Sequence, residues 1–473
     1  MEDRTSGGWA RLTEQRPEYH LVPPTRGAND VQCIFWRGEY HAFYGLSPQF
    51  PLGAPKLWGH AATRDLVRWT HHPPCLEPTP GGPDKDGSWT GCIVDNAGVA
   101  TAFYTGVRPQ AQCMATSRDL ITWVKHPGNP VIGGPPAGLE QIPNFRDPCV
   151  WREADGWHMA IGSGLPGEGS AVLLYHSDDL IHWDYLHPLF VGPSYGCDMY
   201  ECPDFFPLDG KHVLLASTHV NRVPKTLYYV GTYADHRFTP EAEGEVDSGP
   251  NLYAAKTLVD DRGRRILFGW ISEGWSRDME FIAGWSGAYT VPRVLTLGAD
   301  GGLRLSPAEE VATLRQRHWS YSGRAVADGE TQPIPEVRAT RLEIEARLAL
   351  APGAEAGVRV RCTPAGAGPQ EATGIAYNAA EGCLCLDRRS SSVLHDVNVP
   401  KDAWKVPLAL PSGQDLHLRV LLDNSVVEVF ANGVCCLTGR VYPFLPGSDG
   451  VALFARGGMA VFHQLDIWEM ARA

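Results

Sequence analysis

One short pattern occurs three times in the first two hundred residues, and it constrains the fold more than any other feature of the chain. A small or hydroxyl residue, any residue, Asp, Leu, two further residues and Trp follow one another in 63–69, 117–123 and 177–183. Leu66 and Leu120 are 54 residues apart, and Leu120 and Leu180 are 60 apart. Self-similarity at this period predicts a radial array of sheets, one per repeat, with each Trp packed between neighbouring sheets. The alternative is an all-β sandwich with chance similarity.

Runs typical of strands lie between these marks and extend beyond them. They are short, rich in aromatic and β-branched residues, and bounded by Gly, Pro or Asp; they cover 33–36, 39–44, 98–104, 157–162 and 171–175. Two weaker units follow, one made of 212–217 with 227–233 and one of 254–258 with 265–270. We therefore predict an all-β fold that begins with a five-bladed β-propeller over residues 1–315.

The hydrophobic pattern of the sequence changes after Arg315. Runs that alternate or stay apolar, together with the hairpin signal Asn432-Gly433, predict a C-terminal β-sandwich over residues 316–473. A chain of 473 residues is long enough for two domains. Helical periodicity is missing, apart from one short helix that we expect to have Ser306 as N-cap and Pro307 as its first residue.

Composition excludes several classes of partner. The formal net charge is −13 and no run of Lys or Arg is present, so nucleic acid is not expected. No apolar run of about 18 residues occurs, so no membrane span is expected. The twelve cysteines form no CxxC motif, which favours free thiols in a reducing compartment over a zinc site. With no signal peptide visible we expect a cytoplasmic protein, or a secreted one if a leader has been trimmed.

Three acidic residues stand where propeller blades would begin. Asp30 precedes the first strand of blade one, Arg146-Asp147-Pro148 opens blade three, and Glu201 opens blade four. First strands line the channel of a propeller, so these carboxylates should converge. Clustered carboxylates repel, and one pKa rises. An acid beside an ionised partner is what glycoside hydrolysis requires, and the apolar neighbours of Glu201 should keep it protonated. The alternatives are turn residues for Asp30 and Asp147 and a surface residue for Glu201.

Several blocks of the chain resemble glycoside hydrolase family 32, the β-fructosidases, over roughly residues 20–470. The resemblance rests on Asn29-Asp30, Trp58-Gly59-His60-Ala61, Trp89-Thr90-Gly91, Arg146-Asp147-Pro148, Glu201-Cys202-Pro203-Asp204, Phe268-Gly269-Trp270 and Val291-Pro292-Arg293. In the second domain it rests on 423–430 and on Arg440-Val441-Tyr442-Pro443.

The resemblance implies roles for the three carboxylates. Asp30 would be the nucleophile that attacks the fructosyl anomeric carbon, and Glu201 the acid and then the base. Asp147 would hold two ring hydroxyls. Retention of configuration is expected if the carboxyl groups of Asp30 and Glu201 lie about 5–5.5 Å apart. Substrate would be bound by Asn29, Trp58, Trp89, Thr90, Arg146 and Trp270. No metal or organic cofactor is implied, and the partner is a small oligosaccharide; a homodimer is left open.

The first block departs from the family. Gly27-Ala28 stand for a Trp-Met pair, Val31-Gln32-Cys33 for a Pro-Asn-Gly, and Gly45 for a Gln. These changes leave the fructoside, endo or exo action and the leaving group open. Three alternatives remain. The first is a fructosyltransferase, including one that transfers intramolecularly and so cyclises its product to difructose dianhydride. The others are a related five-bladed pentosidase and a non-catalytic carbohydrate-binding protein.

Overall fold

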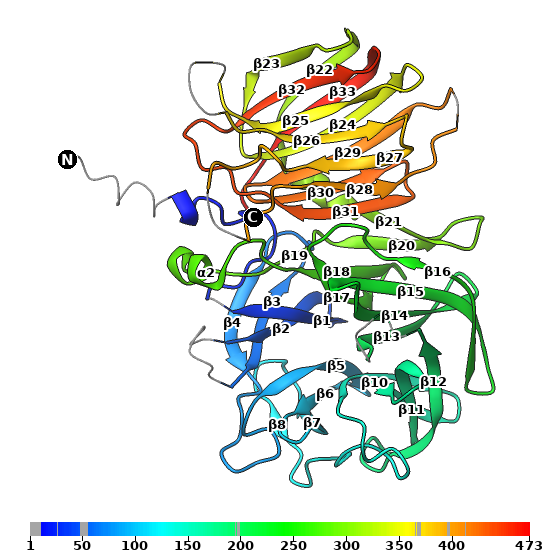
Figure 1. The fold of residues 1–473 in the computed structure, drawn as a ribbon. Coiled ribbons are helices and arrows are strands. Elements are labelled where there is room, and N and C mark those ends of the chain that lie inside the picture. Colours follow the sequence, from blue (N-terminus) through cyan, green and yellow to red (C-terminus); the bar gives the residue numbers. More distant parts are fainter. Residues whose placement is uncertain are drawn as a thin grey trace.

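The computed structural model describes residues 11–25, 27–47, 55–193, 195, 199–364, 366, 370–394, 398–411 and 413–473. Within these ranges five antiparallel sheets follow one another as blades, and two six-stranded sheets lie above them (Figure 1). The predicted five-bladed β-propeller followed by a β-sandwich is confirmed. The helices among the described residues are all too short or too polar to cross a membrane.

Each blade is built from one continuous stretch of chain. The strands are, in blade one, β1 (Ala28–Trp36), β2 (Glu39–Leu46), β3 (Leu57–Thr63) and β4 (Thr70–Cys75); in blade two, β5 (Ser88–Asn96), β6 (Val99–Gly106), β7 (Ala111–Ser117) and β8 (Val124–Lys125); in blade three, β9 (Phe145–Glu153), β10 (Gly156–Leu165), β11 (Gly169–Ser177) and β12 (Asp184–Gly192); in blade four, β13 (Glu201–Leu208), β14 (Lys211–Val220), β15 (Val223–Ala234) and β16 (Arg237–Glu245); in blade five, β17 (Leu252–Val259), β18 (Arg265–Ile271), β19 (Ala288–Tyr289), β20 (Arg293–Leu297) and β21 (Leu303–Pro307). The first strands contact one another around a closed ring, in the order β1, β5, β9, β13, β17 and back to β1.

The repeated sequence pattern is the turn into the outer strand of a blade. Asp119 Oδ1 accepts hydrogen bonds from the backbone N–H groups of residues 121 and 122, and Ser117 Oγ accepts one from Leu120 N–H. Leu120 adopts a left-handed φ of 60°, so the turn needs these bonds to offset the strain. Trp123 then packs edge-on against Phe43 of the preceding blade, with 5.9 Å between ring centroids. The repeat therefore fastens one blade to the next, as predicted.

The same fastening recurs around the ring. Trp183 packs edge-on against Phe103 of blade two, and Trp69 of blade one packs against Phe268 of blade five. Such aromatic pairs contribute about 0.5–1.5 kcal/mol each beyond the area they bury. The contact between Trp69 and Phe268 lies where the first and last blades meet, so the pattern also closes the ring.

The sandwich holds one continuous apolar core between its two sheets. One sheet has the order β22-β33-β24-β29-β30-β31 and the other the order β23-β32-β25-β26-β27-β28. The strands are β22 (Arg315–Val326), β23 (Thr331–Arg338), β24 (Arg341–Leu350), β25 (Glu355–Cys362), β26 (Thr373–Asn378), β27 (Cys383–Asp387), β28 (Ala403–Pro407), β29 (Leu416–Asp423), β30 (Val426–Ala431), β31 (Cys435–Arg440), β32 (Gly450–Arg456) and β33 (Ala460–Met470). The expected boundary between residues 315 and 316 falls at the start of β22, and we retain it as a proposal.

The predicted helix near Ser306 is wrong in its start and type. Ser306 and Pro307 end strand β21, where they pair with Val294 and Arg293, and a 3-10 helix, η1 (Glu309–Leu314), follows with Ala308 as N-cap. The pairing with β20 outweighs the capping signal. An α-helix that we did not predict, α2 (Arg277–Ala283), has Ser276 as its N-cap and Gly284, with a left-handed φ of 81°, as its C-cap.

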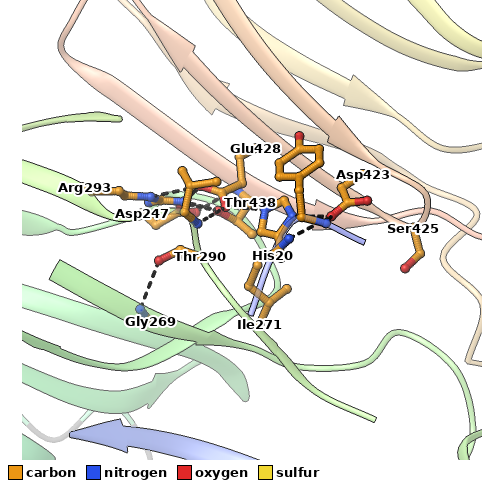
Figure 2. A network of polar contacts seen from close by, with 12 residues as sticks. His20, Asp247, Gly269, Ile271, Thr290, Arg293, Asp423, Ser425, Glu428 and Thr438 are labelled. Carbon is orange, nitrogen blue, oxygen red and sulfur yellow. Dashed lines mark hydrogen bonds and ion pairs between the residues drawn. The ribbon is translucent and has the colours of Figure 1, made fainter. Parts of the chain in front are cut away.

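A buried polar network joins the propeller to the sandwich (Figure 2). Arg293 of β20 donates from Nη1 to Asp247, from Nε and Nη2 to Glu428 Oε2, and from Nη2 to Thr438 Oγ1. His20 lies between Asp423 and Glu428, at 2.8 and 2.9 Å from their nearest oxygens. Val291 N–H also donates to Glu428. The second-domain block 423–430 that resembles the fructosidase family thus holds the two domains together.

The segment before the first blade is tied to the far end of the chain. The backbone N–H groups of Glu18, Tyr19 and His20 all donate to the carboxylate of Asp423. Ala473 N–H donates to the carbonyl of Glu18. Residues 18–20 are therefore held by groups more than 400 positions away.

Candidate active site

A pocket of about 280 Å³ opens where all five inner strands carry the same irregularity. In every blade the pairing of the first strand with the second strand shifts register close to the start of the first strand, at a β-bulge. A bulge turns a side chain out of the regular alternation. The pocket is lined by Asn29, Asp30, Gly45, Lys56, Trp89, Thr90, Arg146, Asp147, Glu201, Cys202, Tyr253 and Trp270, so all five blades contribute to it.

The bulges also place unusual backbone at the pocket. Four of the inner strands have a non-glycine residue with positive φ at this level: Asp30 (35°), Asp147 (63°), Cys202 (49°) and Ala254 (51°). Residues held in such sparsely populated conformations cluster at functional sites, because the surrounding fold must stabilise the strain. The three predicted carboxylates are brought together here from blades one, three and four.

Asp30 is held by one short hydrogen bond. Thr90 Oγ1 donates to its Oδ2 at 2.6 Å. The backbone of its neighbour Asn29 is held as well, because Tyr289 Oη donates to the Asn29 carbonyl at 3.3 Å. The carboxylate of Asp30 therefore has a fixed orientation at the pocket wall.

Glu201 has a polar partner on each oxygen. Arg146 bonds to Oε1 and the hydroxyl of Tyr253 donates to Oε2. Arg146 is itself fixed by Asn144 Oδ1, at 2.6 Å. The expectation that apolar neighbours surround this carboxyl group is wrong, because Tyr200 and Phe205 lie in the core between blades, whereas Arg146 and the Tyr253 hydroxyl contact the Glu201 oxygens.

Asp147 is the most deeply buried of the three carboxylates, with 3% of its surface exposed. Its Oδ2 accepts from Cys202 N–H at 3.0 Å, and its own N–H donates to Thr105 Oγ1 at 3.0 Å. Burial raises the pKa of Asp147 to about 6, with further upward pressure from Glu201 and Asp30, while Arg146 opposes the shift. The predicted rise in one pKa of the trio is thus found at Asp147.

The other predicted binding residues divide into two groups. Asn29, Trp89, Thr90, Arg146 and Trp270 line the pocket. Trp58 does not: its side chain is fully buried, and its Nε1–H donates to the carbonyl of Trp89 at 3.0 Å. The expectation that Trp58 lines the sugar site is therefore corrected. Trp58 fixes the strand that presents Trp89 and Thr90.

One departure from the family, Gly45, is coupled to Asn29, a residue that matches it. A Cβ atom placed on Gly45 would lie 2.6 Å from Asn29 Oδ1, so the Asn29 side chain fills the space that a larger residue at position 45 would need. Asn29 Oδ1 is buried and has no hydrogen-bond partner among the described residues, and the same holds for Trp270 Nε1. Both atoms belong to residues of the pocket wall.

Among the lining residues that were not predicted, Tyr253 and Lys56 bring polar groups to the pocket. Tyr253 stands at the start of β17, at the level where Glu201 stands in β13; the repeat of first strands was a usable signal for it. Lys56 precedes β3, and its ammonium group lies 5.7 Å from the centroid of the Trp89 ring. No motif marked Lys56, because it reaches the pocket from a loop.

Comparison with known proteins gives matches along nearly the whole chain. Residues 20–307 match the model of the glycosyl hydrolases family 32 N-terminal domain, and residues 310–469 match the family 32 C-terminal model. Sucrose-6-phosphate hydrolase of Escherichia coli is 33% identical, over 98% of this chain and 97% of that protein. Fructan 1-exohydrolase w3 of Triticum aestivum is 31% identical, over 98% of this chain and 89% of that protein. The structure of fructan 1-exohydrolase IIa from Cichorium intybus with 1-kestose superposes with a TM-score of 0.88 at 25% identity, covering 97% and 98% of the two chains.

Proposed function

The chain belongs to glycosyl hydrolases family 32 and is a glycoside hydrolase that acts on β-fructosyl linkages; we propose that Asp30, Glu201 and Asp147 carry out the reaction by double displacement. One observation carries this proposal: three carboxylates from blades one, three and four converge on one pocket, each held by its own polar partners. A binding protein would not need a trio of mutually repelling carboxylates, whereas a glycosidase uses that repulsion.

In the first step Asp30 attacks the anomeric carbon of the fructosyl unit. The bond from that carbon to the glycosidic oxygen breaks, and Glu201 gives its proton to the departing oxygen. Thr90 holds Asp30 in the attacking orientation, and Arg146 with Tyr253 holds Glu201. The product of the step is a fructosyl ester of Asp30.

In the second step Glu201, now a carboxylate, takes a proton from water. The water oxygen attacks the anomeric carbon, and the bond to Asp30 breaks, so fructose leaves with the configuration of the substrate. Asp147 accepts hydrogen bonds from two ring hydroxyls and stabilises the positive charge that develops on the ring.

The role of Glu201 can be tested apart from that of Asp30. With a fructoside that has a good leaving group, Glu201→Ala should lose turnover, and added azide should restore it and yield a fructosyl azide of retained configuration. Azide replaces the water that no longer has a base. Turnover by Glu201→Ala equal to that of the wild type without azide would refute the assignment. Product analysis with added sugar acceptor would separate hydrolysis from fructosyl transfer.

We further propose that the leaving group carries a phosphate. Lys56 lines the pocket, and no carboxylate pairs with its ammonium group within the described ranges. Arg146, in contrast, is already bonded to Glu201 and Asn144. A free ammonium group beside an aromatic wall suits an anionic group on the second sugar. The relatives from Escherichia coli and Zymomonas mobilis are named sucrose-6-phosphate hydrolases, which supports the same substrate here.

Lys56→Met tests this second proposal. We expect kcat/KM for sucrose 6-phosphate to fall roughly tenfold, the effect of about 1.4 kcal/mol, with little change for sucrose. Lys85→Met, which removes an exposed lysine paired with Asp86, is the matched control. An equal fall for both substrates would show that Lys56 only supports Trp89, and it would leave the fructosidase assignment intact.

A reducing, cytoplasmic environment is also proposed. The eleven cysteines within the described ranges are all free, and eight of them are buried. Burial raises the pKa of the Cys75 and Cys113 thiols to about 12, so these groups stay protonated. A thiol count under denaturing conditions on freshly purified enzyme would test this proposal.

A further inference from the structure

Two hairpin turns of neighbouring blades meet at the end of the propeller away from the pocket. Strand β9 carries Asp147 near its start and ends at Glu153, about 20 Å further on, since six residues of strand rise roughly 3.3 Å each. The turn after it contains Asp155, and His158 follows on β10. The hairpin between β15 and β16 places His236 beside them, in a left-handed conformation with φ of 59°.

These turns bring together two imidazoles and two carboxylates. One ligand atom from each of Glu153, Asp155, His158 and His236 lies within 4.8 Å of all the others. His236 Nε2 is 2.9 Å from Asp155 Oδ2 and 4.0 Å from Glu153 Oε2, and His158 Nδ1 is 3.7 Å from Glu153 Oε1. We call this group the hairpin cluster.

His158 distinguishes the hairpin cluster from an ordinary group of surface ion pairs. Its side chain is fully buried, and neither ring nitrogen has a hydrogen-bond partner among the described residues. A buried polar atom left without a partner destabilises the fold. His158 Nδ1 lies 3.7 Å from Glu153 Oε1, so the lone pair of a neutral imidazole at this nitrogen would face the cluster. A ligand at this point would use that lone pair.

We propose that Glu153, Asp155, His158 and His236 bind a divalent transition-metal ion of the zinc class. Zinc takes four ligands in a tetrahedron at about 2.0–2.2 Å, which would bring the ligand atoms to about 3.4 Å from one another. The present separations, up to 4.8 Å, would have to shorten through side-chain rotation to reach that geometry. Two imidazoles disfavour calcium and magnesium, which prefer oxygen ligands.

The surroundings of the hairpin cluster fit an ion that enters from solvent. The side chains of Asp155 and His236 are 49% and 33% exposed, so the site is open on one side. Trp151 Nε1–H donates to Glu153 Oε1 at 2.6 Å and orients that carboxylate, the kind of outer contact that metal ligands usually have. The ion would join the β9–β10 hairpin of blade three to the β15–β16 hairpin of blade four. Its role is structural, because the pocket lies at the other end of these strands.

Metal titration of the untagged enzyme tests the proposal. After dialysis against a chelator, Zn²⁺ should bind with a stoichiometry of one by calorimetry and raise the Tm. Co²⁺ should give visible absorption bands of a tetrahedral site, and Ca²⁺ should not compete. His236→Ala and Asp155→Asn should each weaken binding by at least tenfold while kcat on a fructoside stays unchanged.

His182→Ala is the matched control, because His182 is an exposed histidine of blade three that pairs with a single carboxylate, Asp179. This variant should bind Zn²⁺ like the wild type. Absence of stoichiometric Zn²⁺ binding would overturn the proposal, as would equal binding by the His236→Ala and His182→Ala variants. Calcium binding of equal strength would overturn the zinc-class assignment.

Discussion

The pocket and the interdomain network are built from the same chemical groups, but their groups are paired differently. In the network, Asp247, Asp423 and Glu428 face Arg293 and His20, and every side-chain nitrogen and oxygen of these five residues has a partner (Figure 2). In the pocket, Asp147 and Glu201 face Arg146 and Asp30 accepts a hydrogen bond from Thr90, while Asn29 and Trp270 keep buried atoms without partners among the described residues.

This difference in pairing shifts the pKa values of two buried carboxyl groups in opposite directions. Burial acts to raise the pKa of Glu428, but Arg293 and His20 outweigh it and lower the pKa below its ordinary value. For Asp147, burial wins over Arg146 and the pKa rises to about 6. A fully paired buried charge stabilises the fold, whereas an incompletely paired one retains capacity to bind a substrate. The two regions should therefore respond in opposite ways to substitution.

The largest difference is expected for the nucleophile. Asp30→Asn should lower kcat/KM on a fructoside by on the order of 10⁴-fold, because the first step loses its attacking group. The Tm should change little, since Thr90 can still donate to the amide oxygen. Steady-state kinetics and circular dichroism melting measure the two effects. Retained activity would assign the nucleophile to another residue.

In the network, the largest effect should fall on stability. Arg293→Met leaves Asp247 and Glu428 buried without their cation, which should cost about 3–5 kcal/mol. Urea unfolding should show a lower midpoint. Arg304→Met, which breaks a pair with the exposed Asp300, should cost at most about 1 kcal/mol. Similar midpoints for the two variants would mean that the network does not hold the domains.

A matched pair of substitutions compares the regions directly. Asp147→Asn should raise the Tm at neutral pH, and Asp247→Asn should lower it. The folded-state pKa of Asp147, about 6, lies above its ordinary value of 3.8, so folding binds a proton between these values. The contribution of Asp147 to the free energy of unfolding therefore falls as pH rises from about 4 to 6. Above that range the ionised, buried carboxylate destabilises the fold by its full amount. A lower Tm for both variants would contradict the contrast.

The smallest effect should be seen in the pH profile. Asp147 must be ionised to accept hydrogen bonds from sugar hydroxyls, so kcat/KM should fall as pH drops below about 6. A tenfold loss per pH unit is expected on this limb. A profile that stays flat down to pH 4 would remove Asp147 from the role of hydroxyl acceptor.

Sequence reasoning succeeded where a local pattern repeats. The turn at Ser117-Arg118-Asp119-Leu120 and its two copies depend on contacts within a few residues, so the first three blades could be recognised from them, and the last two from strand-like runs. The meeting of Asp30, Asp147 and Glu201 followed from placing each at the start of an inner strand. The resemblance to a known family then supplied their roles.

The features that were not predicted, or were predicted wrongly, depend on contacts between segments that are not adjacent in the sequence. The bulges come from the register between first and second strands, and nothing near Asp30 or Asp147 indicates a left-handed φ. Tyr253 reaches Glu201 across 52 positions. Trp58 was placed in the sugar site because its motif suggested it, but the fold buries it behind Trp89. Strand pairing likewise overrode the helix cap expected at Ser306.

The hydrogen bonds between residues 18–20 and the sandwich affect the order in which the chain can fold during synthesis. Asp423, Glu428 and Ala473 are synthesised more than 400 residues after His20, yet they hold the segment that leads into blade one. Contacts of such long sequence separation slow folding, because the intervening loop must close first. During synthesis, blade one should therefore lack these stabilising contacts until the sandwich has left the ribosome. Truncation within β29–β31 would then release blade one to proteases, although that blade lies at the opposite end of the sequence.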